Sequence, residues 1–234
     1  MFSQGSERGL PGLLVDTDWL YQHLHDPKLR VVDTGPNSRY ADSHVPGAIN
    51  IPHNYIKDAN DSTHVMPPGQ FADIMGRLGI SDDTHVIAYD DNDSLHAARL
   101  WWVLDYYGHS HCSVLDGGWV KWLAEGRPVS TEVPAFSASA PFTPVPNPDV
   151  FCSIDHLKGC VGNEGTIVWD VRSWEEHTGE NPRSNKRAGH VPGAVHMEWR
   201  DVIDPETHTF RPIEEIRPML LGAGITPDKE VITH

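Results

Sequence analysis

Short apolar runs alternate along the chain with segments in which apolar residues recur three or four positions apart. The first pattern is typical of buried strands and the second of helices that cover a sheet. In the first half of the chain, the predicted strands are 30–33, 48–52, 85–89 and 112–115. The predicted helices are 19–24, 71–78, 95–107 and one that starts at 119, with Asp16 and Ser94 as caps for the first and third. This alternation predicts an α/β fold with a mostly parallel sheet flanked by helices.

The chain also repeats itself once. His44-Val45-Pro46-Gly47-Ala48 recurs as His190-Val191-Pro192-Gly193-Ala194, and Val86-Ile87 recurs as Val231-Ile232, each about 145 positions later. A period of this length predicts a duplicated domain. We assign residues 10–130 to the first domain and 151–234 to the second. The proline-rich stretch 131–150 between them is expected to be a semi-extended linker.

Composition and charge exclude several classes of partner. The chain has 234 residues, 18 basic and 33 acidic side chains and a net charge of −15. This acidity argues against nucleic acid and anionic membrane surfaces as partners. No apolar run is long enough to cross a bilayer, and no signal peptide is visible at the start of the chain. Three cysteines form no disulfide framework, so a cytoplasmic protein is expected.

Metal sites and cofactor motifs are not predicted. Cys152 and Cys160 lie eight positions apart and lack the spacing of a zinc knuckle, so both are expected to be partly buried thiols. Asp90, Asp91 and Asp93 resemble a cation-binding loop, but the glycine and the distal glutamate of such loops are missing. No glycine-rich phosphate loop is present.

The landmarks of both copies together resemble the rhodanese family. These landmarks are a strand ending in aspartate, the His-Val-Pro-Gly-Ala turn, a helix ending before Gly-Ile, and Asp116-Gly117-Gly118 in the first copy. The resemblance covers almost the whole chain, and the tandem arrangement is that of thiosulfate and 3-mercaptopyruvate sulfurtransferases. It implies an enzyme that carries sulfur on a cysteine persulfide, without a cofactor.

The resemblance places the nucleophilic cysteine directly after the apolar strand of an active domain. The first copy has Asp90 there, and a carboxylate cannot carry a persulfide, so this domain is expected to be catalytically silent. In the second copy the same position follows His234, so the second domain is expected to be incomplete and the chain as given inactive. Val231 and Ile232 are then expected to expose apolar surface. None of the three cysteines has the required position.

The resemblance also suggests residues that bind the anionic sulfur donor. The second copy has an insertion at 175–187, and the candidates are Arg172, Arg183 and Arg187. Guanidinium groups suit this role because they bind oxyanions bidentately. Arg172 has an equally plausible role as an ion pair that braces the loop. Glu176 stands where mammalian members of the family carry a second arginine, which favours thiosulfate over mercaptopyruvate.

Three functions follow from these features. The first is sulfur transfer from a small anionic donor to cyanide, a thiol or a sulfur-carrier protein. The second is a non-catalytic binding or regulatory module, which predicts a residue other than cysteine after His234. The third is the related phosphatase class, whose active loop is one residue longer. The tandem copies and the tryptophan-rich first domain argue against the phosphatase.

Overall fold

The computed structural model describes residues 12–52, 56–58, 60, 64–135 and 141–234. Contacts between Cα atoms divide the chain into two units, each considered by itself. The first comprises residues 1–150 with 207–209, and the second 151–206 with 210–234. Among the described residues, no helix is long and apolar enough to cross a membrane.

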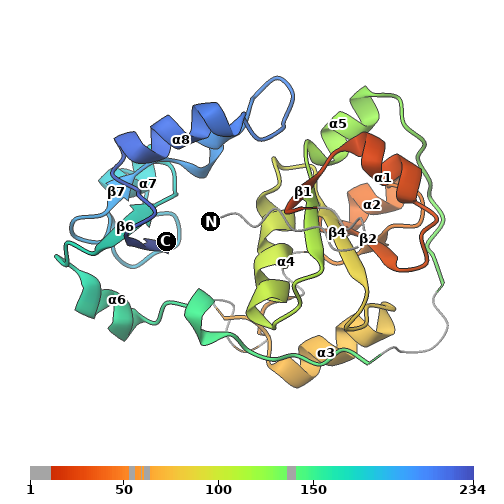
Figure 1. The fold of residues 1–234 in the computed structure, drawn as a ribbon, viewed down its shortest axis with the longest axis horizontal. Coiled ribbons are helices and arrows are strands. Elements are labelled where there is room, and N and C mark those ends of the chain that lie inside the picture. The colour runs from red at the N-terminus through yellow and green to blue at the C-terminus, as the bar shows by residue number, and fades with distance from the viewer. Residues whose placement is uncertain (1–11, 53–55, 59, 61–63, 136–140) are drawn as a thin grey trace. The chain divides into compact units, whose positions relative to one another are not determined.

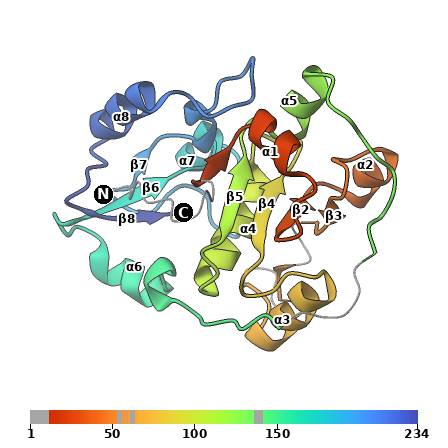
Figure 2. The ribbon, with the colours of Figure 1, turned by 45° about the vertical axis from the view of Figure 1, so that its right-hand side comes forward.

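The first unit is built on a five-stranded parallel sheet (Figures 1 and 2). Its strands are β1 (Leu14–Val15), β2 (Leu29–Asp33), β3 (Ile49–Asn50), β4 (His85–Tyr89) and β5 (Cys112–Leu115). Its helices are α1 (Thr17–His23), α2 (Asn37–Asp42), α3 (Pro68–Arg77), α4 (Leu95–Tyr106), α5 (Gly118–Ala124) and the 3-10 turn η2 (Pro148–Val150). The strand order β1-β5-β4-β2-β3 places β4 at the centre. All five residues of β4 are buried, as expected for a strand covered on both faces.

Alternate residues of the central strands pack into two separate cores. Val86 and Ala88 belong to the core that contains α3 and α4. Ile87 and Tyr89 belong to the core that contains Leu20 of α1 and the tryptophans of α5. This alternation follows from the two-residue period of a strand. It fixes the carboxyl end of β4, and therefore the loop that begins at Asp90, against both layers of helices.

The segment predicted as a linker packs against the first unit in its described part. Phe142 is buried, and its ring lies 5.5 Å from that of Phe71. The backbone amide of Thr143 donates to Asp82 at 2.6 Å, and that of Val145 donates to the Tyr107 carbonyl at 2.9 Å. The segment ends in the 3-10 turn η2, and these contacts tie it to the domain that precedes it. Residues 136–140 lie outside the described residues, as do residues 1–11.

The second unit repeats the central part of the first. It contains α6 (Ile154–Cys160), β6 (Thr166–Asp170), α7 (Trp174–Thr178), β7 (Val195–His196), the 3-10 turn η3 (Trp199–Val202), α8 (Ile213–Gly222) and β8 (Glu230–Thr233). The parallel order β7-β6-β8 matches β3-β2-β4. The sequence predicts that two residues of β8, Val231 and Ile232, expose apolar surface. Val231 is 39% exposed, but Ile232 is only 6% exposed, so the prediction is wrong for Ile232 because its side chain packs into the unit.

The buried histidine that begins β4 makes the stability of the first unit depend on pH. Burial, together with the smaller effects of the neighbouring His111 and His109, lowers the pKa of His85 to about 4. The unfolded chain binds a proton near the ordinary pKa of about 6.5, so it gains protons first as the pH falls. Stability is therefore expected to decline between about pH 6.5 and about pH 4.

We expect the His85→Gln variant to lose less stability on acidification than the unmodified chain. When the pH falls from about 7 to about 5.5, the unmodified chain should lose about 1 kcal/mol more of its free energy of unfolding than His85→Gln loses. Urea unfolding at both pH values measures it, with the exposed His25→Gln as the control. Equal acid sensitivity of His85→Gln and the unmodified chain would contradict the prediction.

Candidate functional site

In the first unit, the loop after β4 folds around the carboxylate of Asp90. Oδ1 accepts hydrogen bonds from the backbone amides of Asn92 and Ser94, at 2.8 and 3.0 Å. Oδ2 accepts from those of His96 and Ala97, at 2.7 and 2.8 Å. Asp90 is 1% exposed. Four converging N–H groups at the start of a helix form a cradle for an anion, and here the protein's own carboxylate fills it.

This arrangement corrects the predicted cap of α4. Ser94 has a left-handed backbone (φ 67°), and its side chain makes no capping hydrogen bond. The Asp90 carboxylate satisfies the free amides instead, because it reaches them from the end of the preceding strand. Both of its oxygens are directed at backbone donors and not at Asp91 and Asp93, which leaves the cation-binding alternative without its first ligand.

The glycines of Asp116-Gly117-Gly118 allow a close approach to this loop. Gly118 has φ +52°, and a Cβ there would lie 2.4 Å from the Asp90 carbonyl oxygen. The next amide, that of Trp119, donates to the same oxygen at 2.8 Å. A side chain at 118 would collide with the loop, so glycine is required for steric reasons as well as for its backbone conformation.

In the second unit, the corresponding edge of the sheet is organised by Asp170, the last residue of β6. Its carboxylate is fully buried and accepts from Nε and Nη2 of Arg172 at 2.8 and 2.6 Å, and from Nδ1 of His177 at 2.9 Å. Burial alone would raise the pKa of Asp170, but the hydrogen bonds from Arg172 and His177 outweigh it and hold the pKa well below its ordinary value. Asp170 is therefore charged at neutral pH.

Histidines surround this ion pair. The rings of His177 and His190 stack with centroids 3.8 Å apart, and His196 Nε2 lies 2.8 Å from the Arg172 carbonyl. His234 Nε2 lies 3.7 Å from the Asp170 carboxylate. Burial lowers the pKa of His234, and the neighbouring Arg172, His177 and His190 lower it as well. The negative charge of Asp170 acts in the opposite direction. We call Asp170, Arg172, His177, His190 and His234 the Asp170 cluster.

The structure places the three predicted donor-binding arginines differently. Arg172 takes part in the Asp170 cluster and also donates to the Gly189 carbonyl at 3.0 Å, so the bracing contact is present. Arg183 forms an ion pair with Glu176, with Nε 2.9 Å from Oε2, and Arg187 is exposed.

Sequence reasoning missed the histidines, although the His-Val-Pro-Gly-Ala turn contained a usable signal. In the first unit its histidine, His44, is fully buried and structural, whereas His190 is exposed and belongs to the Asp170 cluster.

The cysteines lack the surroundings of an activated thiol at the end of a strand. Burial raises the pKa of Cys112 far above its ordinary value, and Cys112 begins β5 instead of following a strand. Burial also raises the pKa of Cys152, which precedes α6. Cys160 is the last residue of α6 and does not follow a strand.

Comparison with known proteins agrees with this geometry. Residues 16–125 match the model of the rhodanese-like domain. The chain is 35% identical to the sulfur carrier protein TtuD of Thermus thermophilus over 238 residues, which cover 96% of this chain and 82% of that protein. The thiosulfate sulfurtransferase of Azotobacter vinelandii is 36% identical, with coverages of 95% and 82%. The chain belongs to the rhodanese family.

Further rhodanese relatives extend the match across both units. The 3-mercaptopyruvate sulfurtransferase of Escherichia coli is 30% identical and is covered over 82% of its length. The crystal structure of SseA from the same organism superposes with a TM-score of 0.85 at 24% identity, covering 94% of this chain and 87% of that chain. The chain therefore has the α/β fold of the family, with parallel sheets flanked by helices, and its homologues include thiosulfate and 3-mercaptopyruvate sulfurtransferases.

Proposed function

We propose that the complete protein is a sulfurtransferase of the thiosulfate type, whose nucleophilic cysteine directly follows His234. The observation that carries this proposal is the register of the two sheets. The Thr34 amide donates to the Tyr89 carbonyl at 2.8 Å, and the Val171 amide donates to the His234 carbonyl at 3.1 Å. His234 therefore corresponds to Tyr89, and the residue after it corresponds to Asp90.

The chemistry needs two half-reactions at this position. The cysteine thiolate attacks the outer sulfur of thiosulfate, the S–S bond of the donor breaks, and sulfite leaves with the bonding electrons. The resulting persulfide then gives its outer sulfur to cyanide, and the thiolate is restored. A cradle of backbone amides like that around Asp90 would stabilise the thiolate, because N–H groups that converge on one point favour negative charge.

The Asp170 cluster would bound the donor site at the carboxyl end of β6. Arg172 is held rigidly by the buried carboxylate, so its charge has a fixed position beside His234. Arg183 and Arg187 place two further guanidinium groups along the insertion. Glu176 neutralises Arg183 through their ion pair, which supports thiosulfate as the preferred donor over the carboxylate-bearing 3-mercaptopyruvate. Acceptors of the proposed reaction are cyanide, a thiol or a sulfur-carrier protein.

A turnover assay tests the proposal with the chain continued past His234 as its gene encodes it, here called the naturally extended chain. With thiosulfate and cyanide, the extended protein should form thiocyanate, and 3-mercaptopyruvate should be the poorer donor. Residues 1–234 alone should be inactive with both donors because the proposed nucleophile is absent. An extended protein that turns over neither donor would contradict the proposal and would favour a binding module, of which the filled Asp90 cradle is the structural precedent.

A further inference from the structure

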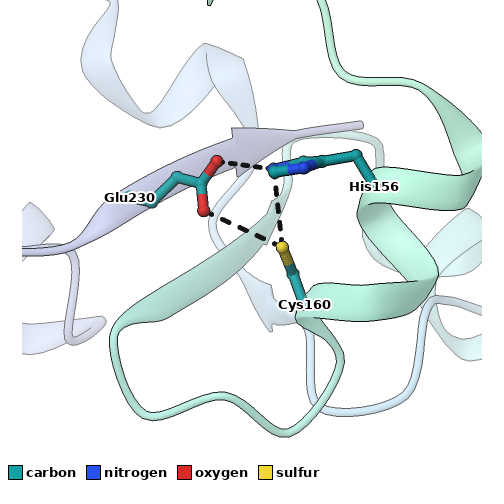
Figure 3. Close-up of side chains that lie close together, drawn as sticks. All are labelled: His156, Cys160 and Glu230. Atoms are coloured by element: carbon teal, nitrogen blue, oxygen red, sulfur yellow. Dashed lines mark hydrogen bonds and ion pairs between the residues drawn. The ribbon is translucent and has the colours of Figure 1, made fainter.

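Three side chains of the second unit converge at the amino ends of its strands, away from the Asp170 cluster. His156 and Cys160 lie one turn apart on α6, and Glu230 is the first residue of β8. One ligand atom from each lies within 4.8 Å of the other two. Figure 3 shows all three side chains directed toward one another from the helix and the strand. Cys160 is buried, whereas the side chains of His156 and Glu230 are about half exposed.

The distances are close to those around a tetrahedral zinc ion. Zinc bonds of about 2.3 Å to sulfur and about 2.1 Å to nitrogen or oxygen separate the ligand atoms by about 3.5 Å. Cys160 Sγ lies 3.5 Å from His156 Nε2 and 3.8 Å from Glu230 Oε2. His156 Nε2 lies 2.7 Å from the other carboxylate oxygen, Oε1, so this pair must separate to admit an ion.

A catalytic relay does not account for the arrangement. A histidine that passes a proton between a carboxylate and a thiol uses its two ring nitrogens for the two partners. Here the same atom, Nε2 of His156, faces both Cys160 and Glu230. That nitrogen cannot donate to the carboxylate and accept from the thiol at the same time. A cation bound between them takes one ligand atom from each of the three side chains.

The fold itself does not require this set of residues. Matching the N-caps Asp16 and Ser153 aligns α1 with α6, which places Trp19 and His23 at the positions of His156 and Cys160. In the first unit these two rings stack, with centroids 4.1 Å apart. The position of Glu230 is occupied there by His85, which contacts Ser113. The first unit therefore has neither a cysteine nor a carboxylate at the three corresponding positions.

We propose that His156, Cys160 and Glu230 form a zinc-binding site. Binding exchanges the thiol proton of Cys160 for the metal, and that proton is released to solvent. Three protein ligands leave one position of the tetrahedron for water. A hollow of about 300 Å³, lined by Cys160, Gly162 and Lys229, lies next to the site. The ion would tie α6 to β8 and so stabilise the second unit. This role departs from the sequence prediction of no metal site.

Metal titration of the reduced, chelator-treated 234-residue chain tests the site. Cobalt(II) is the spectroscopic probe, and zinc is added afterwards as the competitor. One cobalt per chain should bind with a thiolate-to-metal charge-transfer band and the visible bands of tetrahedral cobalt, and zinc should abolish both. Zinc should also raise the unfolding temperature, because a ligand bound only by the folded state stabilises it.

Variants of the three residues separate this site from other thiols and carboxylates. His156→Gln and Glu230→Gln should each weaken cobalt binding about tenfold or more, and Cys160→Ser should remove the charge-transfer band. Cys152→Ser and Glu164→Gln are the matched controls and should bind as the unmodified chain does. The proposal fails if no metal binds at one equivalent, if Cys160→Ser keeps the band, or if Cys152→Ser loses it.

Discussion

Asp90→Ala is expected to lower the free energy of unfolding of the first unit by about 3 kcal/mol or more. The carboxylate accepts four backbone hydrogen bonds while only 1% exposed, and alanine leaves all four donors without a partner. A buried donor that loses its acceptor costs about 1–3 kcal/mol, and water entering the vacated space recovers part of this loss. The stability of Asp90→Asn should lie between those of Asp90→Ala and the unmodified chain. Its amide oxygen can still accept, but its N–H₂ group faces two of the same donors.

Amide hydrogen exchange of the first unit, followed in increasing urea, measures this loss separately from the second unit. Asp91→Ala is the matched control. Asp91 is exposed and contributes only a 3.5 Å ion pair with Arg39, so its loss should cost less than about 1 kcal/mol. Formate should partly restore the stability of Asp90→Ala by occupying the empty cradle. Equal stabilities for the Asp90 and Asp91 variants would show that the loop does not depend on the carboxylate.

Arg172→Met is expected to destabilise the second unit by about 3 kcal/mol. The variant keeps an aliphatic side chain but removes two hydrogen bonds from the fully buried Asp170 carboxylate. Breaking a buried ion pair by removing one partner costs about 3–5 kcal/mol, because the remaining charge stays buried. His177 still donates to Asp170, which places the expected loss at the lower end of this range.

The same variant should show a distinct pH dependence. The folded pKa of Asp170 is depressed, so the stabilising effect of the pair is complete above the ordinary aspartate pKa of about 4 and declines as the pH falls below it. The difference in the free energy of unfolding between Arg172→Met and the unmodified chain should therefore become smaller in acid. Urea unfolding of the second unit measures this difference, with Lys158→Met, which removes the exposed ion pair with Asp155, as the control. Equal free energies of unfolding for Arg172→Met and the unmodified chain at neutral pH would contradict the role of Arg172 as the partner of Asp170.

The hydrophobic pattern was sufficient for the central strands and not for the short helices. The strand 85–89 was predicted with the bounds of β4, because an unbroken apolar run bounded by turns has few alternatives. Helix α7 was not predicted, since its five residues lie in a polar insertion. It forms because Ser173 caps it and the ring of His177 is fixed by Asp170. Such a helix depends on tertiary contacts, which local periodicity does not record.

Candidate chemistry was visible where the residues are close in sequence. The alternative role of Arg172, an ion pair that braces its loop, led directly to the pair of Arg172 with the buried Asp170. The zinc-binding arrangement was not visible, because Glu230 lies seventy positions beyond Cys160 and only the pairing of β6 with β8 brings them together. The spacing of His156 and Cys160, four positions apart on a helix, was the one local signal.

Mass spectrometry of the naturally extended chain after treatment with thiosulfate tests the central claim most directly. We expect the residue after His234 to be a cysteine that gains the mass of one sulfur atom. Cyanide should then remove that sulfur, with one thiocyanate formed for each sulfur lost. Sulfur found on Cys112, Cys152 or Cys160 instead, or a residue other than cysteine after His234, would contradict the account.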